Sequence, residues 1–164
     1  MLILKKANHS DANIIQEIFF HCPFYFEKVD GVAVCDSDAG EKMLEDLPPG
    51  KKSSDKFVGI FYLKERAIGV MDLARGYPDE QIAFLGLLLI REDYQKQNLG
   101  REAVLLCEKK VRDWKLKILR IAVVSNNPVE IFWKKMGFQL IGVTRPYQGK
   151  MLLSEVRVME KLLS

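Results

Sequence analysis

One segment constrains the fold of this sequence more than any other, because a buried strand leads through a short loop directly into a helix. The apolar run 82–90 is followed by Gln95-Lys-Gln-Asn-Leu-Gly100 and then by a helical pattern from about residue 99 to 115. Residues 82–90 are apolar on both faces, which is typical of a central, covered strand. The first N–H groups of a helix lack partners and its dipole favours negative charge. The junction therefore predicts a site for a phosphorylated ligand.

Length and composition indicate one soluble globular domain. The chain has 164 residues, of which 48% are hydrophobic and 29% charged, and no repeat or linker divides it. Its net charge of +3 suits an anionic ligand but is too small and too dispersed to indicate nucleic-acid binding. We expect a single domain over residues 1–164 without a nucleic-acid partner.

The cysteines and the apolar runs favour a cytoplasmic protein. Cys22, Cys35 and Cys107 do not have the spacing of metal ligands, and Cys107 lies on an apolar helical stripe, where packing is its simplest role. No signal peptide is visible, and no run of about 20 apolar residues offers a membrane span. We therefore expect neither a bound metal nor membrane attachment.

The order of predicted elements gives a mixed α/β sheet with helices packed on it. Ser10 or Asp11 is expected to cap the first helix, and the proline-containing segment 21–26 to break it. Asn127 and Pro128 are expected to start the last helix, which ends at Gly137. The predicted strands are 2–6, 57–63, 67–74, 82–90, 117–124, 138–143 and 151–160, and the other helices are 40–47 and 99–115.

Two common phosphate-binding motifs do not account for the loop at 95–100. The dinucleotide fingerprint G-x-G-x-x-G requires three glycines, and only Gly100 is present. The P-loop pattern fails at Pro49-Gly-Lys-Lys-Ser53, because Glu45 replaces its first glycine and Lys52 stands where Ser or Thr is required.

The loop instead resembles the pyrophosphate loop of the GNAT acetyltransferases, written [QR]-x-x-G-x-[GA]. Gln95 and Gly100 match that pattern, whereas Asn98 replaces the usual glycine. This substitution is chemically mild, because Asn is among the few residues that tolerate a left-handed backbone.

A second segment resembles the same family. Residues 126–138 follow the pattern N-x-x-A-x-x-L-Y-x-x-x-G-F with every spacing kept, with Val129 for Ala, Phe132 for the apolar residue and Trp133 for Tyr. The order of strands and helices also matches. The resemblance implies a single-domain GNAT-like fold, with a mixed, mostly antiparallel sheet of about seven strands flanked by about four helices.

The resemblance also implies acetyl-CoA as the cofactor and an acyltransferase that acetylates a primary amine of a small molecule or peptide. Taken one at a time, the matching residues have structural explanations: Gly100 can serve a tight turn, and Asn126 a cap. The residues implied to bind the cofactor are Leu88, Leu89, Ile90, Gln95, Lys96, Gln97, Asn98, Leu99, Gly100, Arg101, Asn126, Phe132 and Trp133.

The catalytic groups are less clear from the sequence. In many relatives a tyrosine at the position of Trp133 protonates the leaving thiolate, and an indole N–H is too weak an acid for this. Tyr147 and Tyr94 are candidate replacements, although packing roles suit either equally well. Residues 82–90 contain no ionisable group, so Asp72 and Glu80 are the candidate bases, and Asp72 is equally consistent with an ion pair at a strand end.

The acceptor site is expected between the first helices and the last strand pair. Its candidate residues are His21, Phe24, Tyr25 and Arg145, with Phe26, Tyr147 and Gln148 nearby. The aromatic residues among them either stack on the acceptor or cover the core.

A second functional hypothesis is a catalytically silent acyl-CoA-binding or sensor module, suggested by Trp133. A homodimer through the closing strands is also possible.

Overall fold

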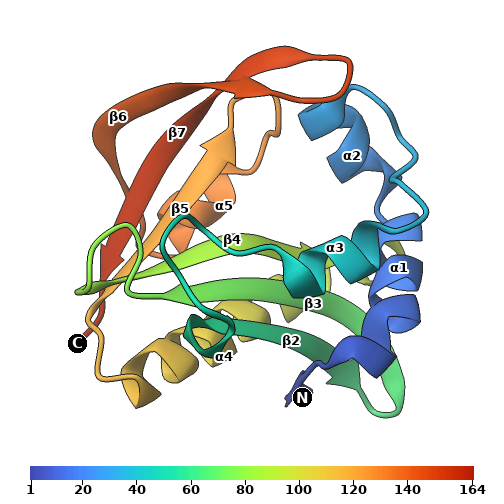
Figure 1. Ribbon diagram of the computed structural model, residues 1–164, viewed down its shortest axis with the longest axis horizontal. Coiled ribbons are helices and arrows are strands. Elements are labelled where there is room, and N and C mark those ends of the chain that lie inside the picture. Colours follow the sequence, from blue (N-terminus) through green and yellow to red (C-terminus); the bar gives the residue numbers. More distant parts are fainter.

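The protein is built on a seven-stranded mixed sheet with helices on both faces, which confirms the predicted fold class (Figure 1). The computed structural model describes residues 1–164. The strands are β1 Leu2–Lys6, β2 Lys56–Leu63, β3 Arg66–Arg75, β4 Ile82–Ile90, β5 Ile118–Val124, β6 Gln139–Gln148 and β7 Leu153–Leu162. The helices are α1 Ala12–Phe20, α2 Pro23–Asp30, α3 Ala39–Glu45, α4 Leu99–Asp113 and α5 Glu130–Lys135.

The strand order is β1-β2-β3-β4-β5-β7-β6, and every neighbouring pair is antiparallel except β4 and β5. A parallel pair needs a crossover connection, and α4 provides it between β4 and β5. The one parallel pair of the sheet is therefore joined by the strand-to-helix segment that is prominent in the sequence.

Two hydrophobic clusters cover the two faces of the sheet. On one face, Ile15 and Ile18 of α1 pack with residues of α2, α3 and strands β2–β4. On the other face, the apolar stripe of α4 packs against the sheet together with α5, and Cys107 is buried there, as its position on that stripe predicts. The sheet thus separates α1–α3 from α4 and α5.

Helix α2 is the main difference from the prediction, which expected segment 21–26 to be only a break. Pro23 ends the preceding helix and also occupies the first turn of α2, where its missing N–H removes no helical bond. A proline can therefore both stop one helix and start the next, which gives five helices where about four were expected.

The expected helix starts were also wrong in detail. Before α1, the Oδ1 of Asn8 accepts from the backbone N of Ser10 at 2.9 Å and caps a short 3₁₀ turn, while Asp11 makes no capping bond to α1. Helix α5 begins at Glu130, so Asn127 and Pro128 lie in the preceding turn.

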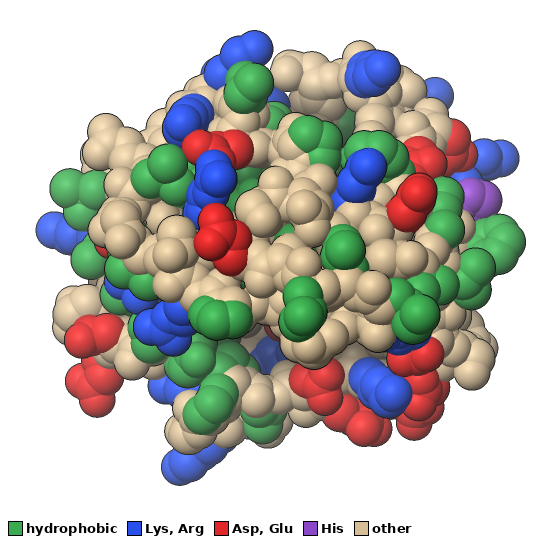
Figure 2. Space-filling model, turned by 90° about the horizontal axis from the view of Figure 1, so that it is seen from above, with side chains coloured by type: hydrophobic (Ala, Val, Ile, Leu, Met, Phe, Trp, Pro, Cys, Tyr) green, Lys and Arg blue, Asp and Glu red, His purple; other side chains and the backbone are tan.

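No single kind of charge dominates the face of the molecule that Figure 2 shows. Figure 2, which looks onto the top of the view in Figure 1, shows Lys and Arg side chains interspersed with Asp and Glu on that face. None of the helices combines the length and the hydrophobicity that crossing a bilayer requires.

Candidate functional site

The site is formed where strands β4 and β5 diverge. Their pairing ends at Leu85 opposite Ile121, although β4 continues to Ile90 and β5 to Val124. At the same point, a bulge leaves Gly86 as an extra residue against β3. Bulges bend a strand and increase its twist, so this one directs the end of β4 away from β5.

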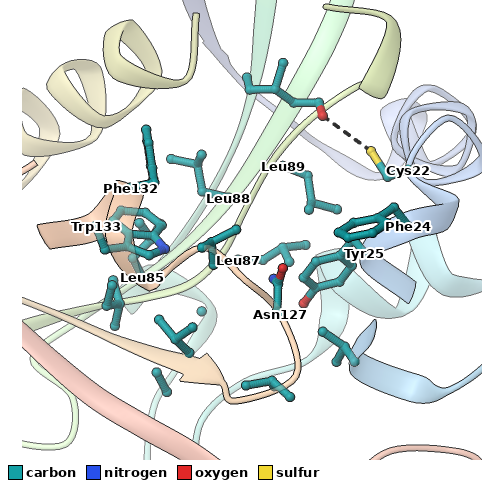
Figure 3. A pocket seen from close by; sticks show the side chains of 18 of the residues that line it. Cys22, Phe24, Tyr25, Leu85, Leu87, Leu88, Leu89, Asn127, Phe132 and Trp133 are labelled. Carbon is teal, nitrogen blue, oxygen red and sulfur yellow. Dashed lines mark hydrogen bonds between the residues drawn. The ribbon is translucent and has the colours of Figure 1, made fainter. Parts of the chain in front are cut away.

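The divergence opens a cavity of about 220 Å³ (Figure 3). Its walls come from α2, the carboxyl ends of β4 and β5, and the segment that leads into α5. Of its 20 lining residues, 16 are hydrophobic. Apolar walls with a few placed polar groups are the usual form of a small-molecule site.

Helix α2 forms one wall of the cavity, and hydrogen bonds fix it to the end of β4. The backbone N of Phe24 donates to Oε1 of Glu92 at 2.7 Å, and the backbone N of Glu92 donates to the carbonyl of His21 at 3.0 Å. The thiol of Cys22 lies 3.7 Å from the carbonyl of Ile90. Glu92 thus satisfies a free N–H at the start of α2. The sequence indicated neither the capping role of Glu92 at the start of α2 nor the contact of the Cys22 thiol with the Ile90 carbonyl.

The loop between β4 and α4 has two residues in the left-handed region. Lys96 has φ 61° and Asn98 has φ 64°, and Asn98 is the residue that replaces the family's usual glycine. The side-chain amide of Gln95 donates to the carbonyl of Ile90 at 2.9 Å, which ties the loop to the strand. Asn98 therefore supplies the backbone conformation for which glycine is otherwise favoured.

The backbone N–H groups of residues 96–101 have no acceptor within the protein. They precede and begin α4, a helix of 15 residues whose dipole adds partial positive charge at this end. A Cβ added to Gly100 would lie 3.5 Å from the ring of Phe132, so this residue sits close to the cavity wall. Unpaired donors of this kind form a binding site for a phosphate-type anion.

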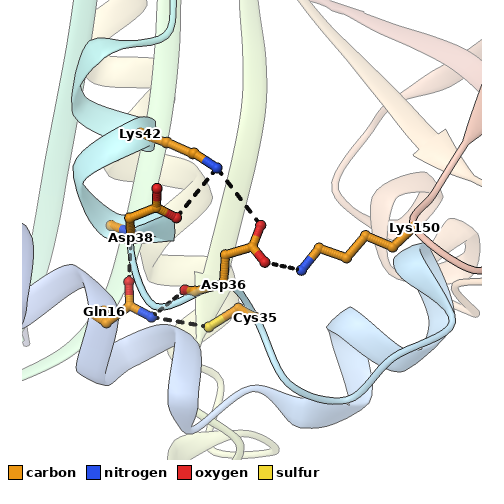
Figure 4. A network of polar contacts seen from close by, with 7 residues as sticks. Gln16, Cys35, Asp36, Asp38, Lys42 and Lys150 are labelled. Atoms are coloured by element: carbon orange, nitrogen blue, oxygen red, sulfur yellow. Dashed lines mark hydrogen bonds and ion pairs between the residues drawn. The ribbon is translucent and has the colours of Figure 1, made fainter.

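A polar network joins the α2–α3 loop to the turn between β6 and β7 (Figure 4). Lys150 pairs with Asp36 at 2.6 Å, and the Asp36 carbonyl accepts from the amide of Gln16 at 2.7 Å. The backbone N of Met151 donates to the carbonyl of Asp30 at 2.8 Å, at the end of α2. The β6–β7 turn therefore supports the wall that α2 forms.

Comparison with known proteins gives the family. The model of the acetyltransferase (GNAT) family matches residues 15–138. The chain belongs to the GNAT acetyltransferases. A sequence search of curated proteins finds no match.

Solved structures of the family share the whole fold. An acetyltransferase from Thermus thermophilus superimposes with a TM-score of 0.80 at 25% identity, covering 99% of this chain and 97% of that one. The ribosomal-protein-alanine N-acetyltransferase from Brucella melitensis gives a TM-score of 0.72 at 16% identity, covering 98% and 99%. The ribosomal-protein-S18-alanine N-acetyltransferase from Escherichia coli gives 0.70 at 13%, covering 100% and 95%. The last two similarities describe the fold alone.

Most of the residues that the GNAT resemblance implied for the cofactor lie around one end of the cavity. Those that line it are Leu88, Leu89, Ile90, Gln95, Phe132 and Trp133. Lys96, Gln97, Asn98, Leu99, Gly100 and Arg101 form the adjoining loop and helix start. Asn126 is exposed and does not line the cavity, whereas its neighbour Asn127 does. Asn127 is therefore the asparagine that the turn before α5 places at the cavity wall.

Trp133 lies between the core and the cavity. It is 8% exposed, and its ring packs edge-to-face on Phe132 and on Phe138, with 5.1 Å between centroids in each pair. Its indole N–H has no acceptor within the protein, and Figure 3 shows the nitrogen on the side of the ring facing Leu87. In place of the family's tyrosine, this position therefore offers a neutral hydrogen-bond donor.

Of the candidate bases, only Asp72 lies near the cavity. Its Oδ2 is 3.8 Å from the position of a Cβ on Gly86, which lines the cavity, and both of its carboxylate oxygens lie 2.9 Å from Nζ of Lys56. Burial raises the pKa of Asp72, an effect that Lys56 partly offsets. Glu80 is exposed in the loop before β4, at the opposite end of that strand from the cavity.

Of the candidate proton donors, Tyr147 lies beside Tyr25, a residue of the cavity wall, although Tyr147 itself does not line the cavity. Burial raises the pKa of Tyr147, and this residue is close enough to Tyr25 to affect the pKa of that phenol. The hydroxyl of Tyr94 accepts from Arg66 at 3.4 Å, and Tyr94 does not line the cavity.

The structure brings together only part of the expected acceptor site. Phe24 and Tyr25 line the cavity from α2, and the hydroxyl of Tyr25 points to the same region as Asn127 (Figure 3). His21 and Arg145 do not line it, and Arg145 is exposed on β6.

Substitution of Gly100 tests the anion site. We expect Gly100→Glu to weaken coenzyme A binding by about 100-fold, because its carboxylate would face the pyrophosphate. Gly100→Ala is the matched control and should bind within about threefold of wild type, since its Cβ meets Phe132 only at ordinary contact distance. Isothermal titration calorimetry measures both affinities. Equal affinity in the Glu variant and the wild type would exclude this loop as the pyrophosphate site.

Proposed function

We propose that this protein is an acetyl-CoA-dependent N-acetyltransferase that acetylates a primary amine. The observation that carries the proposal is the set of unpaired N–H groups of residues 96–101, placed at the open end of the sheet beside an apolar cavity. Membership of the GNAT acetyltransferases supports the same activity. A phosphate anion at one end and an apolar cavity at the other fit the two ends of an acyl-coenzyme A.

The chain has a suitable group for each part of the cofactor. The N–H groups of residues 96–101 would hold the pyrophosphate, with Lys96 and Arg101 adding positive charge. Beyond Leu85, the edge of β4 that faces β5 has no strand partner, so its backbone groups are available to the amides of the pantetheine arm. Asn127 adds a side-chain amide at the cavity wall.

Bound acetyl-CoA supplies a thioester. Its C–S bond breaks as the acceptor nitrogen forms a C–N bond with the carbonyl carbon. The sulfur takes the electron pair of the broken bond and a proton, and the nitrogen loses a proton. Backbone N–H groups at the end of β4 would polarise the carbonyl. We assign the acceptance of the amine proton to Asp72, reached past the missing side chain of Gly86. We assign proton donation to Tyr147.

The alternative is a catalytically silent acyl-CoA-binding module. It is favoured by Trp133, which cannot donate a proton to a thiolate, and by the ion pair that engages Asp72 with Lys56. A thiol pKa of about 8.5 makes the thiolate a tolerable leaving group without an acid, so Trp133 is compatible with catalysis as well.

Thiol release from acetyl-CoA separates the two functions. We expect release that depends on an added amine, with an equal amount of N-acetylated product by mass spectrometry. Coenzyme A affinity, measured by calorimetry on the same sample, serves as the control for a folded site. Binding without release for every amine in a broad panel would favour the silent module, and absence of binding would contradict both.

The assignment of Asp72 is testable by substitution. We expect Asp72→Asn to lower kcat by about 100-fold with unchanged coenzyme A affinity, because the amide cannot accept the proton. In the wild type, kcat should fall as the pH drops through the raised pKa of Asp72, since the carboxylate form is the base. Glu80→Gln is the control and should retain kcat. Wild-type turnover in the Asp72 variant would place the base elsewhere.

A further inference from the structure

The cavity contains few polar groups, and two of them, Gln95 and Glu92, already have partners. Gln95 donates to the carbonyl of Ile90, and Oε1 of Glu92 accepts from the N–H of Phe24. Glu92 is the one charged residue of the lining, and it is exposed to solvent. The lining residues that are not hydrophobic are Gly86, Glu92, Gln95 and Asn127.

The polar groups left inside the cavity are neutral. They are the amide of Asn127, the indole N–H of Trp133 and the hydroxyl of Tyr25. Burial raises the pKa of Tyr25 and raises that of the Cys22 thiol to about 12, so both stay protonated at neutral pH. The cavity therefore provides hydrogen bonds but no buried anion.

Most charged groups of the surrounding elements are held in ion pairs, and the exception, Asp30, lies outside the cavity lining. Asp30, at the end of α2, contributes to the raised pKa of Tyr25 but does not line the cavity. The remaining pairs are Asp72 with Lys56, Asp93 with Arg91, and Glu130 with Lys134 and Arg157. An ammonium ion entering the cavity would lose its hydration without gaining an unpaired carboxylate in the interior.

This environment selects among amines by their basicity. The attacking nitrogen must be neutral, and a cavity without a counter-ion does not stabilise the charged form. At pH of about 7.5, roughly a third of α-amino groups are neutral, compared with about 0.1% of lysine-type amines. An apolar wall likewise favours an acceptor with an apolar side chain.

We propose that the acceptor is an apolar compound whose reacting nitrogen is a weakly basic α-amino group. The proposal rests on the function proposed above and adds the class of acceptor. Two sources carry this chemistry, a free amino-acid amide and the N-terminus of a peptide that begins with an apolar residue. In either case the neutral amine attacks the thioester carbon, the C–S bond breaks, and coenzyme A leaves as the thiol.

Matched amines test the basicity. Leucinamide and 3-methylbutylamine share the isobutyl group and the primary amine, and the carboxamide of leucinamide lowers the basicity of its nitrogen. We expect kcat/KM at pH of about 7.5 to be at least about tenfold higher for leucinamide. Equal or higher kcat/KM for 3-methylbutylamine would overturn the proposal.

A second comparison tests whether the apolar wall of the cavity favours an acceptor with an apolar side chain. Leucinamide should exceed asparaginamide by at least about tenfold in kcat/KM, and equality would overturn the apolar assignment.

A leucine-initiated tripeptide amide tests the peptide source. A kcat/KM above that of leucinamide would assign the acceptor to a peptide N-terminus, and loss of activity would assign it to the small amide.

A substitution in the cavity tests the cause. Leu87 lines the cavity, and Leu87→Glu would add to the interior a carboxylate that no cation already pairs with, with Leu87→Gln as its uncharged control. We expect the ratio of leucinamide to 3-methylbutylamine activity to fall about tenfold in the Glu variant relative to the Gln variant. An unchanged ratio in a folded Glu variant would contradict the charge argument.

The wild-type comparisons hold whether or not the variants fold. Acetylation of 3-methylbutylamine but not leucinamide would refute the acceptor class alone, whereas no acetylation of any amine would refute the enzymatic function itself.

Discussion

The divergence of two parallel strands is the constraint on which the rest of this structure depends. Strands β4 and β5 stop pairing after Leu85, where the bulge at Gly86 turns β4 away. That single change leaves a strand edge unpaired, opens an apolar cavity and places the start of α4 at its end. A continuous β4–β5 ladder would close the cavity and leave no edge for a ligand. The arrangement of the strands, more than any single side chain, therefore determines where the site lies.

The sequence predicted this framework well because its signals are local. A strand that is apolar on both faces, a loop with one glycine and an amphipathic helix each follow from short patterns, and the structure confirms their order. Asn98 follows the same logic, since its identity predicted tolerance of the left-handed backbone that it adopts. The seven strands and the burial of Cys107 were likewise accessible from periodicity.

What the sequence did not predict depends on contacts between distant segments. Helix α2 was missed because Pro23 signals a break, and its start is satisfied by Glu92, which is 68 residues away from Phe24 in the chain. The sequence also does not show that Asn127, and not Asn126, lines the cavity, because the turn before α5 decides which of the two adjacent amides faces it. The relation of Asp72 to Gly86 also depends on strand register, which spacing alone does not fix. Local propensity therefore determines the scaffold, whereas tertiary contacts determine which side chains line the cavity.

The central claim is that the N–H groups of residues 96–101 bind the pyrophosphate of coenzyme A. Titration of ¹⁵N-labelled protein with coenzyme A, followed by amide NMR spectra, tests it most directly. We predict that the largest amide shifts fall on residues 96–101, with smaller shifts along the free edge of β4. Binding that leaves these amides unshifted and perturbs another surface would contradict the claim.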